Sequence, residues 1–416
     1  MISSTLASLR FDDFRSLWVA ALCAGAASWA LIVARGWLVY DLSGSSVWVG
    51  VVTFAAMAPM FLAPPIAGFL ADKFDRKKLL AVLFAAQFLH NLVLALLAVA
   101  GVIEVWHIIA LSFINGCARA SQMPASQALL PNLVPQDYLL NAISLNAATM
   151  QGSRLLGPAL IAPLMAFFGP EGAFISCTLF YVLSFFFTLQ IKTVSVGEMS
   201  SQQSPVSNFF AGLNFVYKHP LVLPLIITVF LHCCLTMSFE SLLPVVGDRF
   251  FRDGGVGATY LMMAVGTGAL CLVLVTANIR DLRIRGRFLF VAAIGSGLAP
   301  ILLGMASSAP LALLGCALMG ASEASYMAIA GAIVQMASPD AIRGRVMSVY
   351  IWHIGGMMAT FNLVNAALAD DFGVAPVLVI AGLTFTVSVV ISVLVLPLRR
   401  LYFQGEVASP KAELAN

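Results

Sequence analysis

Residues 68–78 read Gly-Phe-Leu-Ala-Asp-Lys-Phe-Asp-Arg-Lys-Lys, which concentrates six charged side chains in one short segment. Only 10% of the 416 residues are charged and 61% are hydrophobic, whereas a soluble domain carries about 25% charged residues. Apolar stretches at about 47–70 and 79–100 flank the segment, and each can cross a hydrocarbon core of ~30 Å as a helix. The segment is therefore predicted to be a short loop between two membrane-spanning helices.

The same alternation of apolar runs and short polar gaps continues along the whole chain. Twelve stretches qualify as spans, at roughly 16–40, 47–70, 79–100, 106–127, 141–168, 172–191, 221–246, 256–278, 288–306, 310–335, 346–368 and 374–398. The strands of a membrane β-barrel would alternate polar and apolar residues instead. The sequence therefore predicts an all-α membrane protein with twelve transmembrane helices.

The longest polar interruption, 192–219, separates two sets of six predicted spans, and its residues 208–218 are suited to an amphipathic helix. We therefore expect four parts: an N-terminal half at 1–192, a cytoplasmic linker at 193–219, a C-terminal half at 220–398 and a cytoplasmic tail at 399–416. With the N-terminus in the cytoplasm, 17 of the 22 Lys and Arg residues fall in cytoplasmic segments. Both termini are expected to be cytoplasmic.

The two predicted halves are related in sequence, which is typical of transporters built from repeats. A shift of 204 residues places 116–123 over 320–327, with Arg119 over Glu323. A shift of 209 places 72–78 over 281–287, so that the loops after spans 2 and 8 correspond. Two matches in the correct order indicate an internal duplication.

The loop at 68–78 resembles the Gly-x-x-x-Asp-x-x-Gly-Arg-[Lys/Arg] motif that joins the second and third helices of the major facilitator superfamily. Asp75 stands where that motif has its second glycine, a variant that resembles the branch of enterobactin-type siderophore exporters and macrolide efflux proteins. Stretches at 37–45, 124–131, 141–146, 154–158 and 343–347 also fit this branch. The resemblance covers roughly residues 10–398.

The resemblance implies a major facilitator fold in the bacterial inner membrane, with two pseudo-symmetric six-helix halves. It implies secondary active export of an amphiphilic small molecule, such as a siderophore or a drug, in exchange for protons. It also implies a conformational latch formed by Gly68, Asp72 and Arg76, with a bend at Gly157 and Pro158 that resembles part of an antiporter motif. Ile161 and Ala162 stand where that antiporter motif has two glycines.

Ionisable residues inside the predicted spans are the first candidates for function, because each costs at least ~2.5 kcal/mol at the bilayer centre unless it meets a partner. Glu240 and Glu323 are the only carboxylates well within spans, and we assign them to proton coupling with Arg119 and His232. A permanent Glu–Arg pair that only fixes packing is the alternative. The candidate substrate-binding residues are Arg35, Arg154, Trp37, Tyr326 and Trp352.

Several classes of function are excluded or disfavoured by the same composition. There is no Gly-x-x-x-x-Gly-Lys-[Ser/Thr] sequence for ATP, no paired catalytic groups at useful spacing, and no metal-ligand spacing among the seven cysteines. We therefore expect no enzyme activity and no cofactor, and the net charge of +3 does not suggest nucleic acid. We expect a monomer whose partners are a small-molecule substrate, protons and the bilayer. An importer, a lysophospholipid flippase and a non-transporting receptor or scaffold stay open as alternatives.

Overall fold

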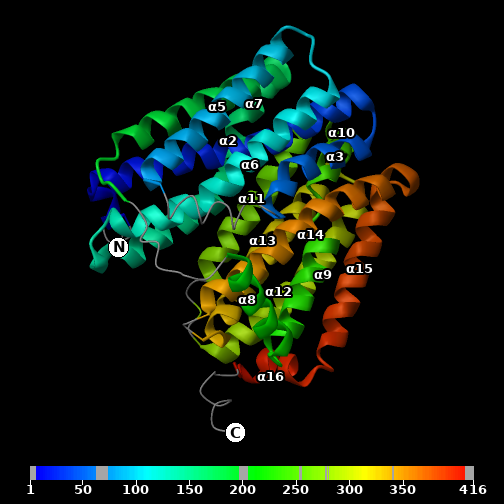
Figure 1. Cartoon of the computed structure of the whole chain (residues 1–416). Helices are drawn as coiled ribbons and strands as arrows, with labels where there is room; N and C mark the ends of the chain where they lie inside the picture. The colour runs from blue at the N-terminus through cyan, green and yellow to red at the C-terminus, as the bar shows by residue number, and fades with distance from the viewer. Residues whose placement is uncertain are drawn as a thin grey trace. The chain divides into compact units, whose positions relative to one another are not determined.

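The computed structural model describes residues 6–61, 74–195, 205–252, 255–276, 279, 281–339 and 342–407. Every regular element within these ranges is a helix, as Figure 1 shows. Within these ranges eight helical segments are long and apolar enough to cross a membrane by length and composition, and one of them, Val222–Phe251, includes a short non-helical interruption. The predicted all-helical membrane class is therefore confirmed for the described part of the chain.

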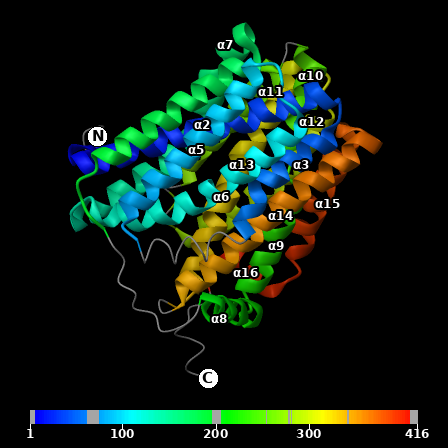
Figure 2. The same ribbon diagram turned by 45° about the horizontal axis from the view of Figure 1, so that its top comes forward.

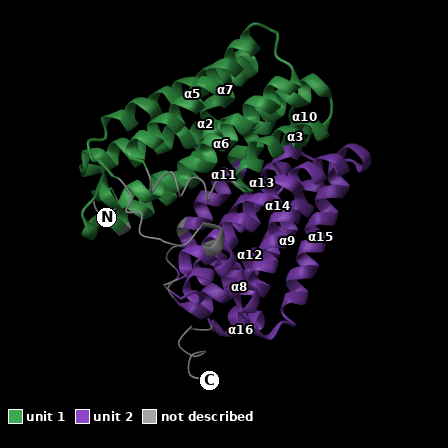
Figure 3. Ribbon diagram, viewed as in Figure 1, with its two compact units in different colours: residues 1–201, 243–263 green, residues 202–242, 264–416 purple. Residues whose placement is uncertain are grey.

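The chain divides into two compact units, residues 1–201 with 243–263 and residues 202–242 with 264–416 (Figure 3). Unit 1 contains η1 (Ala7–Arg10), α2 (Asp12–Ser43), α3 (Ser46–Met57), η2 (Ala58–Phe61), α5 (Arg76–Val99), α6 (Val105–Leu129), η3 (Leu130–Asn132), α7 (Gln136–Gln190) and α10 (Leu243–Phe251). Unit 2 contains α8 (Pro205–Lys218), α9 (Val222–Leu235), η4 (Glu240–Leu242), α12 (Leu282–Gly304), α13 (Ala309–Ala337), α14 (Arg343–Phe372), α15 (Val374–Ser392) and α16 (Leu396–Gln404). Helix α11 (Val256–Thr276) begins in unit 1 and ends in unit 2.

Helix α7 contains two of the predicted spans, 141–168 and 172–191, joined without a gap. The junction is Gly169, whose φ of +63° and ψ of −163° interrupt the helix immediately before Pro170. A positive φ is readily adopted only by glycine, and proline cannot continue the preceding hydrogen-bond ladder. In both Figure 1 and Figure 2 the helices α2, α5 and α7 run side by side in unit 1, and α7 packs against the other two.

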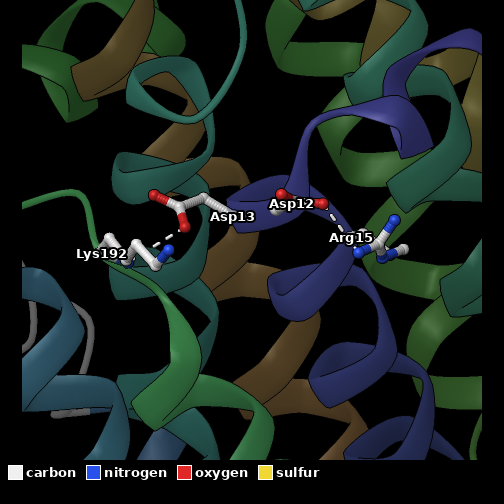
Figure 4. Close-up of polar contacts among 4 residues, drawn as sticks. All are labelled: Asp12, Asp13, Arg15 and Lys192. Atoms are coloured by element: carbon white, nitrogen blue, oxygen red, sulfur yellow. Dashed lines mark hydrogen bonds and ion pairs between the residues drawn. The ribbon is translucent and has the colours of Figure 1, made fainter.

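The first turn of α2 is tied to the end of α7. Asp13 accepts hydrogen bonds from the backbone N–H groups of Lys192 (3.0 Å) and Thr193 (2.9 Å) and from the Thr193 hydroxyl (2.5 Å). Figure 4 shows Asp13 directed toward Lys192, whereas its neighbour Asp12 forms an exposed ion pair with Arg15 at 2.7 Å. Asp13 therefore connects two sequence-distant segments, and Asp12 makes only a local contact.

Unit 2 is organised around two groups of helices. Helix α12 packs against α13, α15 and α16, whereas α14 packs against α8 and α9. Close approach depends on glycines: a Cβ atom at Gly286 would meet the carbonyl oxygen of Leu401, and one at Gly320 would meet that of Val265. The segment 208–218, predicted to be an amphipathic helix, is helical in the structure and lies within α8, Pro205–Lys218.

Gly157 provides the equivalent close contact in unit 1. It lies buried on α7, and a Cβ atom there would meet the backbone carbonyl of Ala26 on α2. Small residues let membrane helices approach until their backbones touch, which maximises van der Waals packing in a medium that offers no hydrophobic drive. The predicted Gly157–Pro158 position thus lies where α7 closely approaches the backbone of α2.

Replacing Gly157 with alanine should lower the melting temperature of the purified protein, because overpacking of this kind costs about 1–3 kcal/mol. Gly152 is the matched control, since it also lies on α7 but has no atom within 4 Å of an added Cβ. Gly152→Ala should leave the melting temperature unchanged or raise it slightly. Equal melting temperatures for the two variants in detergent would contradict the close approach of α2 and α7.

Candidate functional site

In unit 1, two of the predicted arginines meet on one tryptophan. The guanidinium carbon of Arg154 on α7 lies 4.8 Å from the ring centroid of Trp29 on α2, and that of Arg119 on α6 lies 5.8 Å away. Both distances fall within the range of a cation–π interaction. Arg154 is 4% exposed, while Trp29 and Arg119 are half-buried. Three helices thus contribute to one aromatic and cationic group, which we call the Trp29 cluster.

Arg35 lies further along α2 and is bound differently. Its Nε donates to the Leu31 carbonyl (3.2 Å) and its Nη1 donates to the Ser112 hydroxyl of α6 (3.0 Å). These bonds give neutral acceptors to two of the five N–H groups of the buried guanidinium. Trp37 is also buried, with its ring 6.0 Å from that of Tyr40 and directly against the backbone of Gly255.

In unit 2, the structure brings His232 and Tyr326 together. His232 Nδ1 lies 2.7 Å from the Thr236 hydroxyl and 3.2 Å from the Ser296 hydroxyl of α12. The His232 and Tyr326 ring centroids are 4.9 Å apart, and the Tyr326 hydroxyl donates to Thr228 at 2.8 Å. Both side chains are fully buried, so two residues predicted for different roles share one polar core.

The two predicted carboxylates also lie in unit 2, and each is 4% exposed. Glu323 is on α13, one turn before Tyr326. Glu240 opens the short helix η4 that follows α9. Trp352 is not part of this group, because its ring packs on Phe209 of α8 at 5.7 Å and on its neighbour His353 at 5.1 Å.

The predicted seventh span, 221–246, is broken in the structure. Helix α9 ends at Leu235, and helical structure resumes at Glu240. Asn362 and Asn365 of α14 hydrogen-bond to residues in and beside this break: the Asn365 amide donates to the Ser238 carbonyl at 2.8 Å, and the Asn362 side-chain oxygen accepts from the Ser241 N–H at 3.2 Å. Sequence reasoning missed both asparagines, because neither carries a charge or belongs to a motif.

The predicted latch is described only in part, because Gly68 and Asp72 lie outside the described residues. Arg76 begins α5, and its Nη1 donates to the Ala128 carbonyl of α6 (3.0 Å) and to the Ser195 hydroxyl (3.1 Å). Its own N–H donates to the Ser195 carbonyl at 2.9 Å. Arg76 thus joins the start of α5, the end of α6 and the segment after α7 within unit 1.

Comparison with known proteins identifies the family. The sequence model of the transmembrane secretion effector family matches residues 3–410. The chain is 24% identical over 367 residues to the staphyloferrin A transporter of Staphylococcus aureus, covering 86% of this chain and 89% of the relative. It is 20% identical over 395 residues to macrolide efflux protein A of Streptococcus pyogenes, covering 93% and 97%.

This protein belongs to the transmembrane secretion effector family of major facilitator transporters. The fold agrees: a crystal structure of a POT family transporter in complex with 5-aminolevulinic acid superposes with a TM-score of 0.76 at 11% identity, covering 92% of this chain and 95% of that one. The family assignment makes the protein a multi-pass transporter of the plasma membrane and not an enzyme. Within the described ranges, no three His, Cys, Asp or Glu side chains are arranged to hold a metal ion.

The departure of this transporter from the superfamily loop has a local reason. Asp75, which replaces the second glycine, is the N-cap of α5, and its carboxylate accepts from the Lys77 N–H at 3.0 Å. Asp281 caps α12 in the same way, by accepting from the Ile284 N–H at 2.9 Å. Asp75 and Asp281 therefore have the same capping role at the starts of α5 and α12.

The Trp29 cluster of the transporter should be energetically coupled. We expect a double-mutant cycle of Trp29→Leu and Arg154→Met to give a coupling energy of about 0.5–2 kcal/mol, as for a partly desolvated cation–π pair. Trp48→Leu is the matched control, because Trp48 is 45% exposed and lies on a different helix, α3. Additive effects of Trp29→Leu and Arg154→Met on thermal unfolding would show that the two side chains do not interact.

Proposed function

We propose that this transporter exports an amphiphilic small molecule in exchange for protons by alternating access. The proposal includes twelve membrane-spanning helices in two six-helix halves, with both termini in the cytoplasm. The Trp29 cluster is the observation that carries it, because aromatic and cationic side chains from α2, α6 and α7 converge there in the interior of a membrane unit. Intramembrane charges of this kind mark substrate or ion pathways.

The chemistry of the Trp29 cluster suits an amphiphile. The indole offers a flat apolar surface for the hydrophobic part of a substrate, and guanidinium groups donate to ester, hydroxyl or carboxylate oxygens. Arg35 and Trp37 extend the candidate substrate-binding set along α2, and Arg154 belongs to it directly. Tyr326 and Trp352, both in unit 2, stay predicted substrate-binding residues.

Proton coupling is assigned to Glu323, Glu240, His232 and Arg119. An ionised carboxylate is costly in a low-dielectric interior, whereas its protonated form is not. After substrate release to the outside, protonation of Glu323 and Glu240 would neutralise the empty carrier and permit its return. His232 is included because its imidazole is buried beside the Thr236 and Ser296 hydroxyls, and an imidazole can exchange a proton near neutral pH.

The remaining predicted residues are proposed to control the conformational cycle. Gly68, Asp72 and Arg76 would latch the cytoplasmic side, and Gly157 with Pro158 would set the close packing of α2 on α7. One chain carries both the Trp29 cluster and the carboxylates, so we propose a functional monomer. Relatives named as a macrolide efflux protein and a siderophore transporter support a substrate with both polar and apolar parts.

The test is transport by the purified protein in proteoliposomes, with erythromycin and staphyloferrin A as probes and an imposed pH gradient. Flux of either probe against a proton gradient supports the proposal. Flux in the same direction as protons would favour an importer instead. Absence of flux of both probes, together with a co-purifying protein, would favour a receptor or scaffold.

Glu323→Gln should reduce pH-driven flux at least about tenfold, because the amide cannot exchange a proton. Exchange of labelled for unlabelled probe at equal concentrations should be retained, since this mode needs no net proton movement. Asp371→Asn is the matched control: Asp371 is exposed near the end of α14, and its neutralisation should change neither mode. Equal pH-driven flux in the wild type and Glu323→Gln would exclude Glu323 from coupling.

A further inference from the structure

The break between α9 and η4 creates a specific problem for a membrane protein. A continuous helix satisfies its own backbone groups, but a broken one exposes N–H and C=O groups that have no water to bind in hydrocarbon. Residues 236–239 lie between α9 and Glu240, and Ser238, Phe239, Glu240 and Ser241 are all buried. The partners for this segment must therefore come from protein.

Helix α14 supplies them. Asn365 donates to the Ser238 carbonyl (2.8 Å), and Asn362 accepts from the Ser241 N–H (3.2 Å). The same two residues form a second hydrogen bond, in which the Ser241 hydroxyl donates to the Asn362 backbone carbonyl at 2.9 Å. The Ser238 hydroxyl bonds the Cys233 carbonyl at 2.6 Å. Asn362 is 0% exposed and Asn365 is 6% exposed, so no solvent competes for these bonds.

The hydrogen bonds to Ser238 and Ser241 lie on either side of Glu240 in the sequence. Glu240 lies two positions after Ser238 and one before Ser241, so the asparagines fix the backbone on both sides of it. The orientation of the Asn362 amide is itself set, because its Nδ2 donates to the Met358 carbonyl at 3.0 Å. The backbone of Glu240 is thereby fastened to α14.

We propose that Asn362 and Asn365 are positioning residues that hold Glu240 in place for proton exchange. This inference rests on the proposed function, in which Glu240 is a coupling carboxylate. The chain passes to unit 1 at residue 243, directly after η4. The hydrogen bonds of the asparagines therefore fasten Glu240 to unit 2, which also carries Glu323 and His232. The residues from 243 to 263 belong to unit 1, as α2 and α7 do.

The first experiment titrates Glu240 directly in the full-length protein in lipid nanodiscs. Infrared difference spectra against Glu240→Gln identify the carboxyl band of Glu240, and its amplitude is followed with pH. Asn365→Ala and Asn362→Ala should each move the titration midpoint by about one pH unit, because the carboxyl leaves its fixed surroundings. If Asn365→Ala does not fold, Asn365→Leu replaces it, since it keeps the approximate size, loses the amide donor and adds no titratable group near Glu240.

Thr360→Val is the matched control. Thr360 is on the same helix, and its hydroxyl donates to the Gly356 carbonyl of α14 itself. This variant should leave the Glu240 midpoint unchanged. A midpoint that stays unchanged in both asparagine variants would overturn the inference, and so would an equal shift in Thr360→Val.

The second experiment measures pH-driven erythromycin or staphyloferrin A flux across a range of pH. The asparagine variants should shift the pH profile, and in a Glu240→Gln background they should have no further effect on it. A uniform loss of flux at every pH, additive with Glu240→Gln, would show a merely structural role and overturn the inference. If the proposed function is wrong, flux through the wild-type protein will itself be independent of pH. That result would overturn both the proposed function and this inference. A pH-dependent wild type whose profile the asparagine variants do not shift would overturn this inference alone.

Discussion

A polar group inside a bilayer must find its hydrogen-bond partner within the protein. In the described part of this transporter, that requirement decides how several helices pack against one another. Arg35 uses the Ser112 hydroxyl and a backbone carbonyl, and the broken seventh span uses two asparagines of α14. His232 is held by the hydroxyl groups of Thr236, directly after α9, and of Ser296 on α12. Each of these arrangements fixes a neighbouring helix, so the polar residues determine much of the packing geometry.

Close helix packing supplies the second part of the framework. In unit 1, Gly157 allows α7 to approach α2, the two helices that also carry Arg154 and Trp29. In unit 2, Gly320 allows α13 to approach α11, and the same helix carries Glu323. Because Gly157 and Gly320 each lie three residues from one of these charges, the packing that stabilises each unit also determines where its charges lie. A change at either glycine should therefore affect function as well as stability.

Much of the fold was predictable because charge is scarce in this sequence. The apolar runs located the spans, the loop at 68–78 identified the superfamily, and Arg119, Arg154, Glu240 and Glu323 stood out as charges within apolar runs. The rotation of each helix was not predictable, since every face of these helices is apolar. The meeting of Arg119 and Arg154 on Trp29 depends on that rotation and emerged only from the structure. The break after Leu235 was missed for another reason: it is stabilised by α14, more than 100 residues away, and not by a local proline or glycine signal.

The central claim is that substrate and protons exclude one another in the transport cycle. Linkage makes this testable at equilibrium, because a substrate that favours the deprotonated carrier must release protons when it binds. The measurement is the pH change on adding erythromycin or staphyloferrin A to the protein in weakly buffered nanodiscs, followed with an indicator dye. The account predicts proton release that disappears in Glu323→Gln. Proton uptake on binding, or no change in pH with a ligand that demonstrably binds, would contradict it.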